Sequence, residues 1–298
     1  MINHLNKIIK IPKRVIILGS NGFIGSAISD RLILVGIPVL GFGSKELDLM
    51  NLDSGKELAN LLNHDDVLIF VSAKAPCKNL AMLLENIQMA KNVCDALKIN
   101  PVMQVVYISS DAVYGDSDSP ITEDAAVCPS SLHGIMHLTR EVALGLAYAG
   151  PLAIVRPTLV YGLHDPHNGY GPNLFRRLAA EGKEIILFGN GEELRDHVDV
   201  EDVAELVLQI VLHKSTGMIN AVSGDLVSFR ELAELIVASF DTNVSVRGSV
   251  RNAPMPHNGY RAFDNSAVLK SFPDFKFKSH KEGLRRVNQL YKDLAKTW

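Results

Sequence analysis

The sequence predicts an α/β fold: a doubly wound parallel sheet with a smaller C-terminal lobe. Short apolar runs alternate with segments of helical periodicity through the first half of the chain. The first run leads into a glycine turn and a helix, and the second half is richer in loops. Repeated strand–helix units favour a parallel sheet covered by helices on both faces, with ligands at the carboxyl ends of the strands.

The glycine turn is the most informative stretch. Residues 15–18 are consecutive apolar residues, which is typical of a strand buried on both faces. Gly19, Gly22 and Gly25 follow as a G-x-x-G-x-x-G turn, and residues 27–33 show helical spacing. A strand that runs into such a turn and a helix presents bare backbone N–H groups to a pyrophosphate. The predicted dinucleotide-binding residues of this turn are Gly19, Asn21, Gly22, Phe23, Ile24 and Gly25.

The remaining elements follow in order. Further strands are expected at 38–42, 67–71, 104–108 and 152–156, with helices at 58–62 and 81–97. The second half predicts a loop at 163–191 that includes a helix at 174–180, then helices at 199–212 and 229–240, a strand at 218–222 and a basic, irregular tail from Asn243. Residues 13–162 are therefore expected to form a Rossmann-type dinucleotide-binding domain, completed by about 197–224. The segments 163–196 and 225–298 are expected to form the substrate-binding lobe.

Composition limits the class of protein. The chain has 298 residues, of which 47% are hydrophobic and 21% charged, as in a globular protein. A net charge of -3 gives no reason to expect nucleic acid or an anionic membrane as a partner. Three scattered cysteines without metal-ligand spacing favour a reducing cytoplasm. Residues 1–12 are expected to be an N-terminal extension and not a signal peptide, and no apolar run reaches the length of a membrane span.

The end of the second strand bears on the choice of cofactor. An acidic residue there would bind the adenosine ribose and favour NAD. Small Ser44 and basic Lys45 instead suit a 2′-phosphate, which gives NADP a slight preference over NAD. The alternative is that Lys45 is a solvated loop charge. Asp48 and Leu49 are expected at the adenine side of the same pocket.

Four motifs occur together in the chain, in this order after the glycine turn: residues 108–115, 156–162, 188–191 and 195–203. With them the sequence resembles the extended short-chain dehydrogenase/reductases of the NAD-dependent epimerase/dehydratase family. The resemblance implies an NAD(P)-dependent oxidoreductase acting on a nucleotide-diphosphate sugar. It also implies that Ser72, Ala73 and Asn86 support the cofactor, and that the protein forms a homodimer through the helices at 81–97 and 133–149.

The proton-handling residues depart from the family pattern. The resemblance implies that Ser110 holds the reacting oxygen, while a Tyr and a Lys four residues apart handle the proton and the nicotinamide ribose. His133 and His137 stand at those two positions. A neutral imidazole can donate or accept a proton near neutral pH, so histidine-based catalysis is one interpretation. The others are a catalytically weak cofactor- and sugar-nucleotide-binding protein, or a different acid/base, for which Asp111 and Tyr114 are the nearest candidates.

A metal is not predicted. His133 and His137 have a spacing that can chelate a metal ion, and His164, Asp165 and His167 are possible further ligands. No His-Glu-x-x-His motif or cysteine ligand supports such a site, and histidines near a sugar also bind hydroxyl groups.

The residue after Asp111 narrows the reaction. Family dehydratases resemble one another in carrying Glu there, and the enzymes that make GDP-fucose carry Cys, whereas this chain has Ala112. Keto-sugar reduction therefore remains, with 4-epimerisation through a transient ketone as the alternative. The run at 46–49 resembles deoxysugar ketoreductases, which favours reduction.

Substrate contacts also follow from the resemblance. Asn173 and Arg195 match the family residues at the sugar-nucleotide phosphates, where a guanidinium fork suits a diphosphate. Leu187 and Phe188 are expected to wall the base. Arg261 is a further candidate for the substrate, as are Arg176, Arg177 and Arg251.

Overall fold

The computed structural model describes residues 2–240 and 243–295 and confirms the predicted α/β class. Its centre is a 7-stranded sheet in the order β1-β10-β6-β5-β4-β2-β3, with all pairs parallel except β1 with β10. These strands are β1 (Asn3–His4), β2 (Val15–Leu18), β3 (Val39–Phe42), β4 (Val67–Phe70), β5 (Gln104–Ile108), β6 (Leu152–Pro157) and β10 (Ser215–Ala221).

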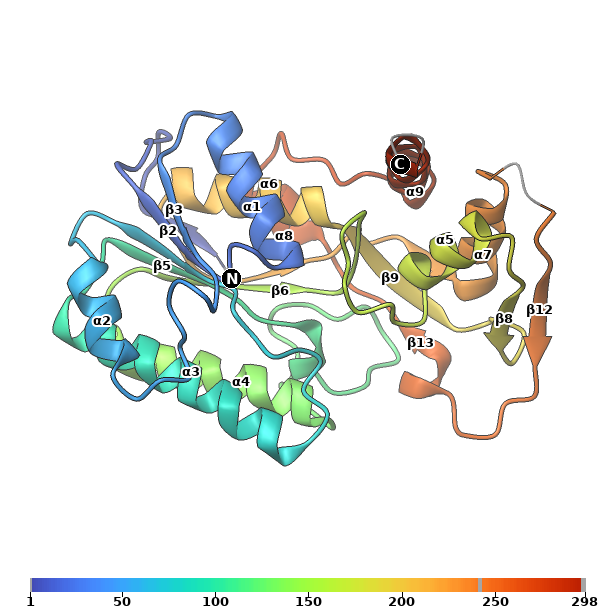
Figure 1. Cartoon of the computed structure of the whole chain (residues 1–298), viewed down its shortest axis with the longest axis horizontal. Helices are drawn as coiled ribbons and strands as arrows, with labels where there is room; N and C mark the ends of the chain where they lie inside the picture. Colours follow the sequence, from blue (N-terminus) through green and yellow to red (C-terminus); the bar gives the residue numbers. More distant parts are fainter. Residues whose placement is uncertain (1, 241–242, 296–298) are drawn as a thin grey trace.

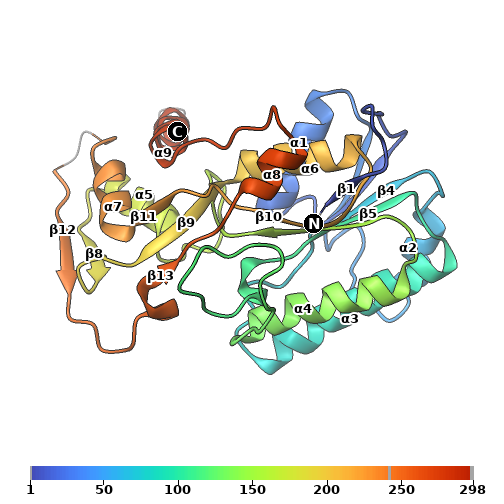
Figure 2. The same ribbon diagram turned by 180° about the vertical axis from the view of Figure 1, so that it is seen from behind.

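Helices cover both faces of this sheet (Figures 1 and 2). One face carries α1 (Phe23–Leu34), α6 (Val200–Leu212) and α8 (Ser266–Ser271), and the other α2 (Ser54–Leu61), α3 (Leu80–Ile99) and α4 (Leu132–Ala147). Two apolar cores form between the sheet and these layers, and β2 and β4 are buried along their whole length. Burial on both faces explains why apolar runs alone predicted these strands.

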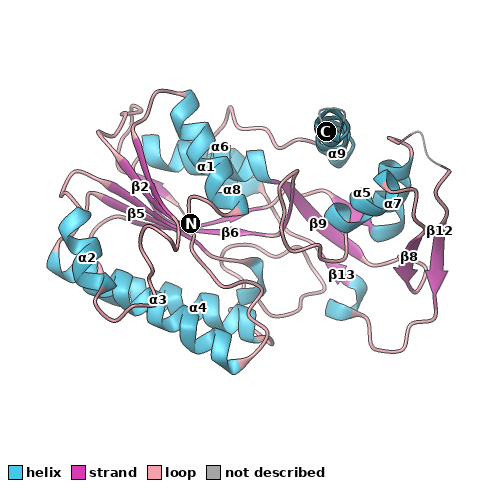
Figure 3. Ribbon diagram, viewed as in Figure 1, coloured by secondary structure: helices cyan, strands magenta, loops and turns pink. Residues whose placement is uncertain are grey.

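A second group of elements lies beyond the carboxyl ends of the strands (Figure 3). Its strands are β7 (Leu159–Tyr161), β8 (Ile185–Phe188), β9 (Leu194–Asp199), β11 (Leu226–Ser228), β12 (Val246–Ser249) and β13 (Tyr260–Arg261). Its helices are α5 (Pro172–Ala180), α7 (Phe229–Val237) and α9 (His280–Ala295). These elements share a core of their own. The domain boundaries given above stay a prediction, and residues 241–242 and 296–298 of the predicted lobe lie outside the described residues.

One expectation about the ends of the chain is corrected. The tail is not irregular, because α8 and the 16-residue α9 lie in it. Charged residues are frequent in α9, but Leu284 and Val287 lie on one face and are buried in the core of this second group of elements. The N-terminal extension also joins the fold, since Asn3–His4 pair with Thr216 and Ser215. No helix of the described chain is long and apolar enough to cross a membrane.

Candidate active site

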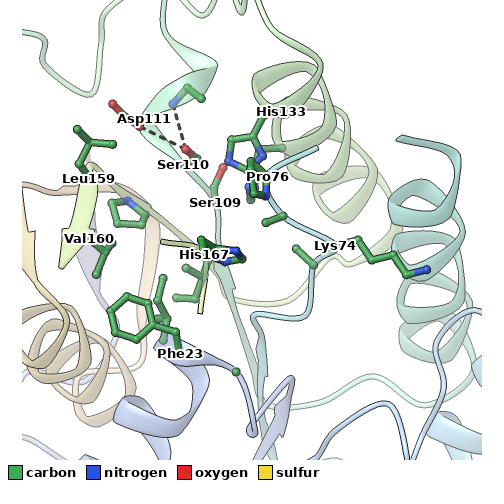
Figure 4. Close-up of a pocket in the computed structure, with 18 of the residues that line it drawn as sticks. Phe23, Lys74, Pro76, Ser109, Ser110, Asp111, His133, Leu159, Val160 and His167 are labelled. Carbon is green, nitrogen blue, oxygen red and sulfur yellow. Dashed lines mark hydrogen bonds between the residues drawn. The ribbon is translucent and has the colours of Figure 1, made fainter. Parts of the chain in front are cut away.

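A cleft of about 1350 Å³ runs along the carboxyl ends of the strands. Most of the predicted site residues line it: Gly19, Asn21, Gly22, Phe23, Ile24, Gly25, Ser44, Asp48, Leu49, Ser72, Ala73, Ser110, Asp111, His133, His137, Arg195 and Arg261. Lys45, Asn86, Asn173 and Leu187 do not line it. In Figure 4, His133 lies beside Ser109, Ser110 and Pro76, and Phe23 lies below them near the glycine turn.

The glycine turn has the shape of a dinucleotide cradle. Gly19 has a φ of +93°, and a Cβ there would lie 2.8 Å from the backbone nitrogen of Ser72. A Cβ on Gly25 would lie 2.0 Å from the Gly19 carbonyl oxygen. Gly22 caps α1 without a side-chain hydrogen bond, so the N–H groups of the first turn face the cleft unoccupied by a protein side chain. Because close backbone approach and bare N–H groups are what a pyrophosphate needs, this turn fits the predicted dinucleotide.

The loop after the second strand also contains a carboxylate, Glu46, which was not among the predicted cofactor-binding residues. Glu46 Oε2 accepts the backbone N–H of Gly43 at 2.8 Å, so this carboxylate turns toward the chain at the strand end. Ser44 lines the cleft, whereas Lys45 is exposed and forms no ion pair with a described residue. Asp48 accepts the backbone N–H of Met50 at 3.0 Å, which fixes its loop.

Asn86 acts behind the cleft wall. It is fully buried, its Oδ1 accepts the backbone N–H of Lys74 at 3.0 Å, and its Nδ2 donates to the Lys74 carbonyl at 3.0 Å. The side chain therefore holds the segment that follows β4, where Ser72 and Ala73 face the cleft.

Ser110 and Asp111 begin the short helix η1 (Asp111–Val113) at the end of β5. The Ser110 hydroxyl accepts the backbone N–H of Ala112 at 3.1 Å and donates to Asp111 Oδ1 at 3.3 Å. Asp111 Oδ2 in turn pairs with Arg261 Nε at 3.1 Å. Asp111 is thus an ionic partner of Arg261, which weakens its candidacy as an independent acid/base.

His133 and His137 lie together on α4 as the spacing predicted. Their ring centroids are 4.7 Å apart at an interplanar angle of 88°. His133 Nδ1 accepts the backbone N–H of Cys77 at 3.4 Å, and His137 Nδ1 lies 2.8 Å from the Tyr107 hydroxyl. Burial lowers the pKa of His133, with Arg140 and His167 acting in the same direction and Asp111 opposing them. Burial, His133 and Arg140 lower the pKa of His137 well below its usual value.

Tyr114 is occupied by a buried network. Its hydroxyl donates to Asn220 Oδ1 at 2.8 Å and accepts from Arg156 Nη1 at 2.8 Å. Arg156 also pairs with Glu141 at 2.6 Å. Burial raises the pKa of Tyr114, so it holds its proton and connects β6 to β10.

The described residues include no group of three or more His, Cys, Asp or Glu arranged to hold a metal ion. His167 lines the cleft, whereas His164 is exposed and does not line it.

The far end of the cleft is rich in arginine. Arg195, Arg251 and Arg261 line it, and Glu193 pairs with Arg195 at 3.0 Å and Arg251 at 3.3 Å. The Nε atoms of Arg195 and Arg251 are buried without a hydrogen-bond partner in the described chain. Guanidinium groups that line a cleft are suited to bind phosphate oxygens.

Other predicted substrate residues lie elsewhere. Because side chains alternate along β8, Leu187 is fully buried in the core of the second group of elements, while Phe188 is 55% exposed and lines the cleft. Asn173 accepts the backbone N–H of Gly162 at 3.1 Å and is tied to Arg176, so both hold the loop after β7. Arg177 pairs with Asp165 at 3.8 Å and also supports this loop.

Several residues in the cleft or directly behind its wall were not predicted from the sequence. Tyr107, Arg140, Glu193 and His257 lie there only because the fold brings separate segments together. Helical spacing could have indicated only Arg140, because it lies on α4 about one turn after His137 and therefore on the same side of the helix.

The chain is similar in sequence to nucleotide-sugar enzymes. A trifunctional UDP-glucose 4,6-dehydratase/UDP-4-keto-6-deoxy-D-glucose 3,5-epimerase/UDP-4-keto-L-rhamnose-reductase of Arabidopsis thaliana is 25% identical over 332 residues, covering 96% of this chain and 48% of that protein. The chain thus spans about half the length of that relative. A putative UDP-glucose 4-epimerase of Methanocaldococcus jannaschii is 26% identical over 313 residues, covering 95% of this chain and 100% of that protein.

The solved structures contain the same fold. A GDP-L-fucose synthetase from Naegleria fowleri bound to NADP superimposes with a TM-score of 0.83 at 18% identity, covering 100% of this chain and 99% of that one. Residues 15–222, more than half of the chain, match a single family in sequence. With its glycine turn, doubly wound sheet and cleft, the chain belongs to the NAD-dependent epimerase/dehydratase family.

Proposed function

We propose that the protein is an NAD(P)-dependent oxidoreductase that reduces a keto group of a nucleotide-diphosphate sugar. The proposal rests on the residues that line one cleft. These are the glycine turn at one end, three arginines at the other, and Ser110 and His133 on the wall. This order matches the parts of the substrates and the reaction, namely a dinucleotide, a reacting carbon and a diphosphate.

The glycine turn, Ser44, Asp48, Leu49, Ser72 and Ala73 would hold the dinucleotide. When bound, its nicotinamide ring carries the hydride that reduces the sugar carbon. We propose NADP as the preferred form, because Ser44 lines the cleft and Lys45 is exposed beside it, while Glu46 turns to the backbone of Gly43. Binding of NADPH and NADH to the wild type and Lys45→Ala tests this, with loss of the preference expected in the variant.

His133 is the proposed proton donor. Because the Cys77 N–H donates to Nδ1, the neutral ring carries its proton on Nε2 and offers an N–H to a keto oxygen. When Nδ1 takes up a proton and releases the Cys77 N–H, the protonated ring would donate its Nε2 proton to that oxygen as the carbon is reduced, and it would return to the neutral form. The Ser110 hydroxyl, fixed at the start of η1, would hold the same oxygen.

His137 and the arginines have binding roles in this proposal. The Tyr107 hydroxyl, whose pKa is raised by burial, keeps its proton and donates to His137 Nδ1, so Nε2–H of His137 is free for the nicotinamide ribose. Arg195, Arg251 and Arg261 would bind the diphosphate. Phe188 stacks against Tyr170 with ring centroids 4.6 Å apart and would wall the base.

A nucleotide-sugar 4-epimerase is the second candidate, since a putative UDP-glucose 4-epimerase is among the relatives. An epimerase regenerates its cofactor and a reductase consumes it. Purified protein is incubated with NADPH and a panel of 4-keto nucleotide sugars, where we expect net oxidation of NADPH. In a second assay it is incubated with NAD and the corresponding 4-hydroxy nucleotide sugars, where interconversion of the two C4 epimers without net change of the cofactor would favour the epimerase. Tight cofactor binding with no product from any substrate would indicate a protein that binds without turnover.

The roles of individual residues are tested in the same assay. His133→Ala should lower kcat by about 100-fold or more, since general acid catalysis contributes on that order. The control is His164→Ala, because His164 is exposed and outside the cleft. Unchanged turnover in His133→Ala would contradict the assignment of His133.

We also propose a homodimer formed through α3 and α4, and a reducing compartment such as the cytoplasm. The two helices pack side by side and leave Leu84 (63% exposed) and Leu146 (85%) uncovered. Cys77, Cys94 and Cys128 are free thiols. Light scattering tests the first proposal.

A further inference from the structure

Arg140 is a buried residue on the helix that carries the two histidines. It is on α4, three residues after His137, and only 1% of it is exposed. Its guanidinium packs over the Phe70 ring at 4.8 Å from the ring centroid. A charged group in such a place needs a physical explanation, because burying a charge is costly unless it is well compensated.

All hydrogen-bond partners of this guanidinium are neutral. Nε and Nη2 donate to the Asn86 carbonyl at 3.1 and 2.8 Å, Nη2 to Asn86 Oδ1 at 2.9 Å, and Nη1 to the Ser72 carbonyl at 2.8 Å. No carboxylate of the described residues lies within ion-pair distance of it, whereas buried Arg156 on the neighbouring strand pairs with Glu141. The positive charge of Arg140 is therefore solvated by the backbone and not cancelled, since a guanidinium stays protonated in proteins.

Two aromatic residues, Phe70 and Tyr107, connect the Arg140 guanidinium to the proposed catalytic histidines. The Phe70 ring under the Arg140 guanidinium lies 5.4 Å from the Tyr107 ring, centroid to centroid. The Tyr107 hydroxyl lies 2.8 Å from His137 Nδ1, and the His137 ring lies against that of His133. The same guanidinium holds Ser72 and Asn86, which shape the cleft wall beside these rings. One buried cation thus binds the cleft wall directly and is connected to the histidine network through Phe70 and Tyr107.

We propose that Arg140 supplies the permanent positive charge of this active site in place of the lysine that is absent at position 137, and positions the histidine pair through Tyr107. The inference rests on the function proposed above. Arg140 is a positioning residue, because it acts through other groups and does not reach the cleft. Its charge favours the neutral form of both rings, and it makes a protonated His133 a stronger acid toward a keto oxygen.

Other groups also face the two rings. Asp111 on η1, His167 on the loop after β7, the backbone of Cys77 after β4, and His137 and Arg140 on α4 surround His133. Tyr107 on β5, His133 and Arg140 surround His137, and Glu141 acts on Tyr107. Asp111 is the carboxylate that opposes Arg140 at His133, and it is itself paired with Arg261.

The test is a proton NMR titration of the His133 ring in the full-length protein, with the signal assigned by its loss in His133→Gln. Arg140→Gln should raise the pKa of His133 by about 0.5 to 1 unit, since a nearby like charge is removed. Arg140→Lys keeps a charge and should leave the pKa closer to the wild-type value. If Arg140→Gln does not fold, Arg140→Met is used in its place, because the Met side chain still packs on Phe70 but carries no charge. Unfolding temperature and NADPH binding report whether each variant is folded.

The outcomes separate this inference from the proposed function. If removal of the charge leaves the pKa of His133 unchanged in a folded variant, Arg140 only holds the wall and the inference is wrong. A raised pKa with no turnover of any keto sugar supports the inference and overturns the proposed reduction. If the pKa of His133 rises and the protein also reduces a keto sugar, the pH profile of reduction in Arg140→Gln should shift to higher pH by the same amount as the pKa. A purely structural role of Arg140 would not produce this shift.

Discussion

Asp111 Oδ2 lies 3.1 Å from Arg261 Nε, so two residues 150 positions apart form an ion pair at the floor of the cleft. Arg261 also donates to the Gly115 carbonyl at 3.3 Å and lies 3.0 Å from His257 Nδ1. Asp111 follows Ser110 at the end of β5, while Arg261 lies on β13. The pair therefore couples the proposed reaction centre to the part of the molecule proposed to bind the diphosphate.

Arg261→Gln should weaken substrate binding more than it slows the reaction. Arg261 is 3% exposed, and its loss leaves Asp111 without its partner. We expect KM to rise by about 10- to 100-fold, which corresponds to losing about 1.5–3 kcal/mol from one charged hydrogen-bond donor. Steady-state kinetics measure this, with Arg177→Gln as the control because Arg177 does not line the cleft. A fall in kcat at unchanged KM would contradict a role in binding.

Gly25→Ala should abolish dinucleotide binding. The added Cβ would lie 2.0 Å from the Gly19 carbonyl oxygen, so the turn must open. We expect a loss of about 1–3 kcal/mol in the free energy of unfolding from the overpacking. The matched control is Gly145→Ala on α4, where a Cβ meets nothing within 4 Å and should stabilise the helix by about 0.5–1 kcal/mol. Fluorescence titration with NADPH and thermal unfolding measure the two effects; equal binding by both variants would contradict the cradle.

The rate of reduction should rise as the pH falls. Reduction takes a proton from His133, whose pKa burial holds below 6.5. The protonated fraction grows as the pH approaches that pKa and levels off below it. Oxidation of the corresponding hydroxyl needs the neutral ring and should show the opposite profile. Initial rates of both directions between pH 5 and 8 test this, and a pH-independent reduction would exclude His133 as the donor.

His197 should make the protein less stable in acid. Its ring is 1% exposed, neither nitrogen has a hydrogen-bond partner in the described chain, and burial lowers its pKa to about 3. The unfolded chain binds this proton near pH 6.5, so the stability present above that pH is lost as the pH falls toward 3. At pH 4.5 the loss is about 2–3 kcal/mol. Urea unfolding of wild type and His197→Phe at pH 7.5 and 4.5 should show a smaller acid loss in the variant.

Leu146→Asp should give a monomer if α3 and α4 form the proposed dimer. Leu146 is 85% exposed, so a charge there costs the single chain little, whereas it would be buried in such an interface. Light scattering gives the mass of both proteins. Val250→Asp is the control, because Val250 is 84% exposed and lies between β12 and η2 (Pro256–Gly259).

The sequence predicted β2, β4, β5 and β6 because each is an apolar run buried along almost its whole length. It could not choose between Leu187 and Phe188, since a strand of apolar residues does not reveal which face meets the core. The α9 helix was missed because its apolar stripe is narrow and lies among charged residues. Tyr107 and Arg140 escaped prediction for another reason: their roles depend on Asn86, Ser72 and Phe70, which only the tertiary fold brings near them.

The pairing of β1 with β10 has a consequence for handling the protein. His4 contacts the Ser215 hydroxyl at 2.7 Å and the Ser271 carbonyl at 2.9 Å, and the N–H groups of Asn6 and Lys10 donate to the end of α6 and the residue after it. Without these residues the outer edge of β10 at Ser215 and Thr216 would present open N–H and C=O groups, which recruit strands from other chains. Trimming the first twelve residues to obtain a shorter expression product would therefore promote aggregation.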